Sequence, residues 1–509
     1  MTSAVLTVDR DGVVTRINGH ALDNPKVHVE FADAREVLRT TRRRYDVIFS
    51  EPSNPYRAGI SSLYTKEYYD AALEHLADDG LFVQWLQAYE VDAWAVATAS
   101  VTLRQVFGDV EIWQPMGGDL FLVARRKAAS VDMGKLRTLL AREPFASGTL
   151  AAWRTTSAEG VVAHYLGNGG LANTFLSHDM GAINTDDQNL LEFAFARGVG
   201  MGRGVDADLA HLAERLGHDR PDVVGGVDWS LVAEERALFF PGERQELSRT
   251  MNPNALRSVI DAYRDGNFAK ALHTWKGMKR VPRSVGEAVI VSEAASKAGE
   301  RTDEALVGLL GDPVEQAINK SLWSARHGDG PAAVAALAFV FENARKNPWI
   351  RQAQLRAALT LAEEIATRNP KFARRLYDLL SVPFAVEVVR DARLIVAAKA
   401  AFATQDAALC VKALEPLEPP PWDRTVRQMR VSCYSKTQDP LLPTAERELL
   451  AMLVLDTPIG ASIPSPPRAA PADAGADAST NVETTSPDAG LDASDDAAVD
   501  AGGHEAGAP

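Results

Sequence analysis

The chain has 509 residues, of which 46% are hydrophobic and 24% are charged, and its formal net charge is −14 at neutral pH. That length allows two or three domains with sizeable cores. The acidic balance, with no basic stripe and no interleaved aromatic residues, argues against a nucleic-acid partner, and no apolar run approaches the roughly 20 residues that a membrane span needs.

The first residues of the sequence and its two cysteines indicate the cellular compartment. The first residues, MTSAVLTVDRDG, lack the basic patch, the apolar stretch and the cleavage site of a secretory signal. The two cysteines, Cys410 and Cys433, are too few for a disulfide framework or a tetrahedral zinc site. His178 has no second ligand at metal-binding spacing, so no metal site is predicted. We therefore expect a reducing, cytoplasmic setting.

Residues 1–127 alternate short β-rich runs with helical stretches. The runs AVLTV, VHVEF, YDVIF, GLFVQW, DVEIW and DLFLVA predict strands, while REVLRT, YTKEYYDAALEHLA and AWAVATASVTLRQVF have the spacing of helices. This alternation indicates a mostly parallel α/β sheet with right-handed crossovers. The last two runs flank Gly117 and Gly118 and predict an antiparallel hairpin at the edge of the sheet.

The middle of the chain changes from mixed to helical composition. Residues 128–200 are mixed, and we interpret them as a C-terminal extension of the α/β domain. Residues 201–458 are rich in Ala, Leu, Glu and Arg. Here NALRSVIDAYRDGNFAKALHTWKGM resembles a tetratricopeptide repeat around Gly266, and LWSARHGDGPAAVAALAFVF repeats the pattern around Gly328. The uneven spacing predicts a degenerate α-helical repeat domain whose core lies between helix pairs, with a binding groove for a protein partner as a second possibility.

The C-terminal segment, residues 459–509, is rich in Ala, Asp, Pro and Gly and has almost no large apolar residues. From Pro464 onward it contains nine acidic residues and one basic residue, so it supplies eight of the fourteen excess negative charges. Such a segment cannot bury enough apolar surface to offset the loss of chain entropy. We predict a disordered acidic tail.

The stretch after the YDVIF strand carries the most chemical information. A buried strand there ends in a proline-containing turn that lifts Glu51 and Asn54 above the carboxyl edge of the predicted sheet. In open α/β sheets, ligands bind at that edge. A carboxylate in such a turn can accept a proton from a bound amine or hold a cation. On its own, Glu51 could equally be an exposed turn residue.

Four motifs carry a family resemblance. They are EPSNP at 51–55, LYTKEYY at 63–69, GLFVQW at 80–85 and NTDD at 184–187. In this order they resemble the polyamine aminopropyltransferases, the spermidine synthase family, and most closely its bacterial branch fused to membrane helices. The resemblance covers roughly residues 4–197. It implies a methyltransferase-type fold that transfers an aminopropyl group from decarboxylated S-adenosylmethionine, a co-substrate and not a permanently bound cofactor, to a polyamine-type amine.

The resemblance also implies roles on the amine side of the site. Glu51 stands where the family has the acid that helps to deprotonate the attacking amine. Asn54 stands where a second acid helps to hold the amine, so this chain lacks one charge for a diammonium substrate. Gln84, at the end of the GLFVQW run, is assigned to the same substrate site, although packing at the strand end is its plainer interpretation.

Three further residues fall at cofactor-side positions. Asp33 stands where the family contacts the adenine amino group, and capping of the helix that follows is an equally weighted alternative. Thr7 occupies the position of the acid that binds the ribose, with Asp9 two residues further on. The NTDD motif is interpreted first as a helix start.

The family fold opens with a central strand and a glycine-rich turn that this sequence does not contain. Glycine is needed in that turn because a side chain would occupy the space of the cofactor. The chain begins at the expected second strand, AVLTV, and Gly12 and Gly19 are isolated. We expect a truncated or start-miscalled relative. In such a relative, the strands AVLTV and YDVIF either pair directly with one another, or a segment upstream of this sequence supplies the missing strand between them.

Three hypotheses follow. The leading one is a spermidine-synthase-like aminopropyltransferase domain, possibly inactive in this chain, joined to helical repeats. The competing one is a non-catalytic scaffold whose repeats bind a protein partner. A third retains the fold but binds a different nucleoside or amine.

Overall fold

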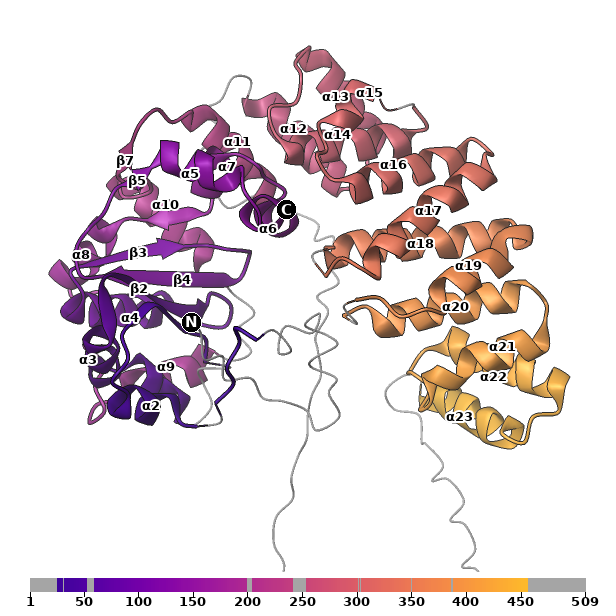
Figure 1. Cartoon of the computed structure of the whole chain (residues 1–509), viewed down its shortest axis with the longest axis horizontal. Helices are drawn as coiled ribbons and strands as arrows, with labels where there is room; N and C mark the ends of the chain where they lie inside the picture. The colour runs from indigo at the N-terminus through magenta and orange to yellow at the C-terminus, as the bar shows by residue number, and fades with distance from the viewer. Residues whose placement is uncertain are drawn as a thin grey trace, which may run out of the picture. The chain divides into compact units, whose positions relative to one another are not determined.

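A five-stranded mixed sheet forms the centre of the N-terminal part of the chain (Figure 1). The computed structural model describes residues 25–30, 32–52, 59–198, 204–240, 253–300, 302, 304–348, 350–385 and 388–455. The strands are β1 (Tyr45–Ser50), β2 (Leu76–Gln87), β3 (Asp109–Trp113), β4 (Asp119–Arg125) and β6 (Tyr165–Gly167), in the order β1-β2-β4-β3-β6. β1 is parallel to β2, and β4 is antiparallel to both β2 and β3.

The predicted β3–β4 hairpin is confirmed, but its predicted place at the edge of the sheet is wrong. β4 inserts between β2 and β3, and β6 adds to the far side of β3 in antiparallel orientation. β6 has only three residues, YLG. So short a strand gives no alternating pattern that sequence analysis could detect.

The structure does not confirm the first two predicted strands, AVLTV and VHVEF. AVLTV lies outside the described residues. In the VHVEF run only His28 has bridge character, and no continuous strand is formed over the residues of that run that the structure describes. Within those same limits, β1 pairs with β2 alone. Its other edge is where the missing central strand is expected, between the predicted strands AVLTV and YDVIF.

One face of the sheet is deeply buried by helices. The helices of this part are α2 (Ala34–Thr40), η2 (Ile60–Tyr64), α3 (Lys66–Glu74), α4 (Ala93–Val106), α5 (Met133–Leu140), α6 (Phe145–Trp153), α7 (Ala158–Val162), α8 (Gly169–Ser177) and α9 (Leu190–Gly198). Phe82 and Leu122 point into a core that α3 and α4 cover. Tyr69 of α3 packs edge-on against Phe82 at 5.5 Å between ring centroids.

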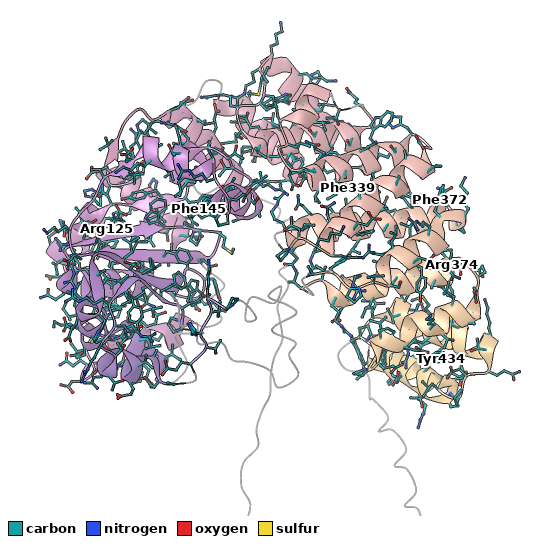
Figure 2. All side chains as sticks on the ribbon, in the orientation of Figure 1. Arg125, Phe145, Phe339, Phe372, Arg374 and Tyr434 are labelled. Carbon is teal, nitrogen blue, oxygen red and sulfur yellow. A yellow bond between two sulfur atoms is a disulfide. The ribbon has the colours of Figure 1, made fainter. Side chains whose placement is uncertain are left out.

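The opposite face is only partly covered. Val47 and Phe49 of β1 remain 54% and 42% exposed. Phe49 leans on Phe121 of β4 with ring centroids 5.3 Å apart. Further along this face, Arg125 pairs with Glu111 across β3 and β4 (Figure 2). Parallel strands normally lie between two helical layers, so apolar side chains of β1 that would be buried in a complete layer face solvent here.

Residues 204–240 contribute to the same part of the molecule. They form α10 (Asp206–Leu216), β7 (Val223–Val224) and α11 (Trp229–Phe239). Leu209 of α10 belongs to the core beneath the sheet, and β7 pairs in parallel with β5 (Val131–Asp132). The domain boundaries at 127, 200 and 458 stay predictions.

The remaining described residues are almost entirely helical. The helices are α12 (Pro253–Arg264), α13 (Phe268–Met278), α14 (Val285–Ala298), α15 (Glu304–Gly308), α16 (Pro313–Arg326), α17 (Gly330–Ala344), α18 (Gln352–Arg368), α19 (Ala373–Leu380), α20 (Arg390–Ala403), α21 (Ala407–Leu414), α22 (Arg424–Thr437) and α23 (Leu442–Leu455), with short η4 (Pro370–Phe372) and η5 (Glu415–Leu417). Gly266 and Gly328, with φ of 72° and 80°, make the turns α12–α13 and α16–α17. Gly330 gives Phe372 room, because a Cβ there would lie 2.2 Å from the ring (Figure 2). The predicted combination of an α/β sheet with a following helical part is confirmed. The described sheet is mixed and not mostly parallel, because β1–β2 is its one parallel pair. The tetratricopeptide character stays a prediction, and the predicted disordered tail, 459–509, lies outside the described residues.

The two cysteines are paired, which their number alone did not predict. Cys410 of α21 and Cys433 of α22 form a disulfide with 6.1 Å between the Cα atoms. Disulfides persist mainly in oxidising compartments, so the pairing weighs against the cysteine argument for a reducing setting. The cytoplasmic location stays a prediction. Among the described helices, none combines the length and the apolar character needed to cross a bilayer.

Candidate functional site

The end of β1 places Glu51 at the carboxyl edge of the sheet, as predicted. Ser50, the last residue of β1, stands opposite Gln84 of β2 in parallel register. Glu51 follows at once and is exposed, while Pro52 after it is buried. The predicted substrate residue Asn54 lies outside the described residues, as do Thr7 and Asp9.

Gln84 lies beside this edge and is fully buried. Its amide nitrogen donates to the carbonyl oxygens of Trp85 at 3.1 Å and Ser50 at 3.4 Å. The amide therefore ties the last residue of β1 to β2. This contact supports the packing interpretation, and the role in substrate binding stays a prediction.

Asp33 caps helix α2. Its Oδ1 atom accepts hydrogen bonds from the backbone nitrogens of Arg35 at 2.8 Å and Glu36 at 3.3 Å. The capping interpretation is thus confirmed, and the adenine role stays a prediction. Burial raises the pKa of Tyr68 of α3, while a hydrogen bond with Ser50 and the charge of Arg35 lower it and the charge of Asp33 raises it. Helix α2 packs against α3.

The cap predicts a measurable stability effect. Replacement of Asp33 by alanine removes an acceptor for two backbone N–H groups and should lower the free energy of unfolding by about 1 kcal/mol. Replacement by serine, which also caps helices, should cost no more than a few tenths of that amount. Denaturant unfolding of both variants measures the difference. Equal stability of Asp33→Ala and the unmodified chain would contradict the capping role.

Arg35 is a residue that the sequence analysis missed. Its guanidinium binds Asp186 through two hydrogen bonds of 3.0 and 2.6 Å and donates to the carbonyl oxygen of Ser62 at 3.2 Å. The hydrogen bond with Arg35 lowers the pKa of Asp186 and raises that of Arg35. The pair fixes α2 against the NTDD motif. The motif is recognisable in the sequence, but nothing in the sequence indicates that Asp186 pairs with a residue 151 positions away.

The asparagine of that motif has a structural role. Asn184 is fully buried, donates from Nδ2 to the carbonyl oxygen of Tyr64 at 3.1 Å, and accepts from the backbone nitrogen of Leu191 at 3.2 Å. It therefore caps the start of α9 and holds the segment that precedes α3. The helix-start interpretation holds for Asn184 alone, because α9 begins at Leu190, after the motif has ended. Within the described ranges, no three His, Cys, Asp or Glu side chains gather in a way that could hold a metal ion.

Comparisons with known proteins agree with this arrangement. A family profile described as the spermine/spermidine synthase domain matches residues 5–115. The polyamine aminopropyltransferase of Alkaliphilus oremlandii is 28% identical over 119 residues, which are 22% of this chain and 42% of that protein. The enzyme of Oceanobacillus iheyensis is 36% identical over 124 residues, 23% of this chain and 24% of that protein. Polyamine aminopropyltransferase 1 of Streptomyces coelicolor is 37% identical over 114 residues, 22% of each chain.

The matched part thus spans at most about two fifths of these relatives. It contains β1, β2, β3 and the turn with Glu51. The motifs, the parallel β1–β2 pair with Glu51 at its carboxyl edge and the family profile agree. Residues 5–115 of this chain therefore match the spermidine-synthase-like family.

Proposed function

We propose that the site at the carboxyl edge of β1 is built for aminopropyl transfer from decarboxylated S-adenosylmethionine to an amine. The observation that carries this proposal is the position of Glu51, which follows a parallel strand directly and stands exposed beside Gln84. That edge is the ligand-binding edge of open α/β sheets. A carboxylate there is placed to act as a general base toward a bound amine.

In this reaction the chain takes part in one proton transfer, from the attacking amine to Glu51. The amine nitrogen attacks the aminopropyl carbon bonded to the sulfonium, and the carbon–sulfur bond breaks. Its electron pair stays on sulfur and yields methylthioadenosine. The nitrogen loses a proton to Glu51. Asp33, if it contacts the adenine, would do so from the exposed start of α2. The chain matches only part of the length of these enzymes, so their full activity is part of this proposal.

The test is formation of methylthioadenosine from decarboxylated S-adenosylmethionine and putrescine, followed by mass spectrometry. Replacement of Glu51 by glutamine should lower the rate about 100-fold or more, since general bases contribute at least that factor. Glu74→Gln changes an exposed carboxylate at the end of α3 and serves as the matched control. Equal rates for Glu51→Gln and the control would refute the role of Glu51.

A second function, a non-catalytic scaffold, is favoured by a cavity in the helical segment. A space of about 450 Å³ lies among α15, α16 and α17, with Asn319, Lys320, Trp323 and Asp329 in its wall. Such a mixed polar and aromatic wall suits a protein or peptide partner. Calorimetric titration with methylthioadenosine separates the two functions. No heat at millimolar ligand, together with no turnover, would leave the scaffold.

A further inference from the structure

A small cavity lies far along the chain from the Glu51 turn. It has a volume of about 170 Å³. Its wall is formed by the segment before α7, by α11, by the segment before α14 and by the end of the α15 region. The residues that matter are Thr155, Ser157, Glu235, Pro282, Val285 and Leu309. The wall therefore combines hydroxyl and carboxylate oxygen atoms, which we call its polar side, with apolar side chains. Thr156, Arg283 and Ser284 also line it.

Three oxygen atoms converge on the polar side. The Thr155 hydroxyl lies 3.2 Å from the Ser157 hydroxyl and donates to Glu235 Oε1 at 3.2 Å. The Ser157 hydroxyl donates to the same carboxylate oxygen at 3.5 Å. Each hydroxyl oxygen accepts one backbone N–H, from Ser157 and Gly160 respectively, and retains a second lone pair.

Among the residues that the structure describes, buried Glu235 has no cationic partner. Only 2% of it is exposed, and its second carboxylate oxygen, Oε2, makes no hydrogen bond within the described part of the chain. A buried carboxylate is normally paired with a cation or shifted toward its neutral form. Burial, assisted by the nearby negative charges of Glu287 and Glu234, raises the pKa of Glu235 to about 7.

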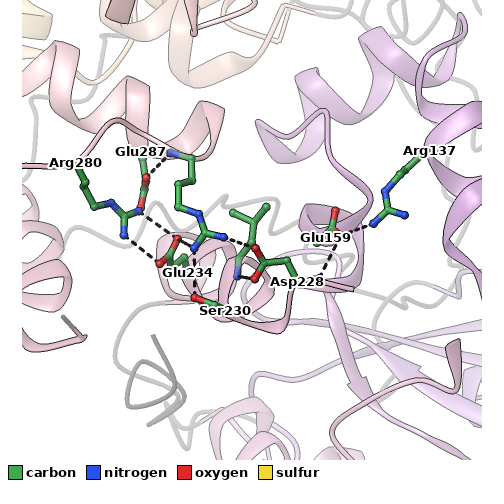
Figure 3. A network of polar contacts seen from close by, with 9 residues as sticks. Arg137, Glu159, Asp228, Ser230, Glu234, Arg280 and Glu287 are labelled. Atoms are coloured by element: carbon green, nitrogen blue, oxygen red, sulfur yellow. Dashed lines mark hydrogen bonds and ion pairs between the residues drawn. The ribbon is translucent and has the colours of Figure 1, made fainter. Parts of the chain in front are cut away.

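The surrounding charges leave a deficit of positive charge. A network of ion pairs lies next to the cavity, and Figure 3 shows Arg280 in it bound to Glu234 and Glu287. In the same network Arg283 binds Asp228, Ser230 and Glu234. Arg283 also reaches the cavity wall, but its guanidinium is already held. With Glu235, four carboxylates face two guanidinium groups. The cluster has two excess negative charges when all four are ionised.

We propose that this cavity binds the primary ammonium group of an alkyl amine. The ammonium donates to Glu235 Oε2 and to the free lone pairs of the Thr155 and Ser157 hydroxyls, at the short distances typical of charge-assisted hydrogen bonds. Its alkyl chain lies against Pro282, Val285 and Leu309. A bare metal ion would leave that apolar wall in contact with its hydration water, which favours the organic cation. This site is separate from Glu51 and does not depend on the proposed transfer reaction.

The experiment is calorimetric titration of the full chain with n-butylamine at pH 8, in the Glu51→Gln background so that the proposed catalytic site is disabled. We expect millimolar binding. Glu235→Gln should weaken it at least tenfold, whereas Glu446→Gln, at an exposed position of α23, should leave it unchanged. n-Butanol, which has the same chain length without the charge, should not bind measurably.

A second variant keeps the proposal open to refutation if Glu235→Gln fails to fold. Leu309 is 42% exposed on the apolar wall, so Leu309→Lys should be tolerated, and its ammonium should repel the ligand and weaken binding severalfold. Circular dichroism verifies the fold of each variant. Unchanged affinity in the folded Glu235→Gln or Leu309→Lys variant, or equal affinity for n-butanol, would overturn the proposal.

Discussion

Replacement of Arg280 by methionine is expected to lower the free energy of unfolding of the surrounding helices by about 3–5 kcal/mol, the usual cost of leaving a buried ionic partner uncompensated. Arg280 donates to both carboxylate oxygens of Glu234, at 3.0 and 3.2 Å, and also binds Glu287. Those two glutamates are 1% exposed each. Burial already raises the pKa of Glu287, and Arg280 opposes that shift. Loss of the guanidinium leaves two neighbouring buried carboxylates with Arg283 as their remaining cation.

Native-state hydrogen exchange in α11 and α14 measures this change locally, because these helices carry the two glutamates. Arg142→Met, at an exposed position, is the matched control and should stay within about 0.5 kcal/mol of the unmodified chain. The double variant Arg280→Met with Glu287→Gln should regain more than about 1 kcal/mol, because it removes one uncompensated charge. A loss under about 1 kcal/mol for Arg280→Met would show that the network contributes little.

The stability of the same region should fall as the pH rises through the titration of Glu235. In the unfolded chain this carboxyl loses its proton near its ordinary pKa of 4.5, whereas in the folded chain burial holds the pKa at about 7. Between these values the folded state binds more protons, so its contribution is present in full below pH 4.5 and is lost as the pH passes 7. The shift corresponds to about 3 kcal/mol.

Besides burial, the groups around Glu235 determine how far its pKa is raised. The Thr155 and Ser157 hydroxyls stabilise the charged form, and Glu234 and Glu287 oppose it. Guanidinium unfolding at pH 4.5 and pH 8 of the unmodified chain and of Glu235→Gln isolates the effect on stability. The stability difference between the two proteins should change by about 3 kcal/mol over that range. The same difference at both pH values would mean that Glu235 titrates alike in the folded and unfolded chains.

Much of the fold followed from local pattern. The alternating run around Phe82 predicted β2, and the glycines between the last two runs of the α/β part predicted the β3–β4 turn. In the helical part, Gly266 marked a turn that only a residue tolerant of positive φ makes without strain. These features depend on residues close to one another in the chain. Strand β6 escaped prediction because three residues contain too little periodicity.

The residues of the candidate site also divide into those predicted from local motifs and those that only the structure revealed. Glu51 was located from its motif, since a strand followed by a proline turn fixes where the next carboxylate stands. The sequence allows two roles for Asp33, and the structure establishes the cap. Arg35 was missed because its partner Asp186 lies in a motif that had another explanation.

The sequence by itself determined the family resemblance of the N-terminal part, the helical character of the later part and the position of Glu51 at the end of a strand. Only the tertiary structure decided the Arg35–Asp186 pair, the Cys410–Cys433 disulfide and the contact of Thr155 with Glu235. The physical reason is the distance along the chain over which each interaction acts. Backbone hydrogen bonds and side-chain periodicity act over a few residues and leave a local signature, whereas a buried charge receives its partners from segments that folding brings together.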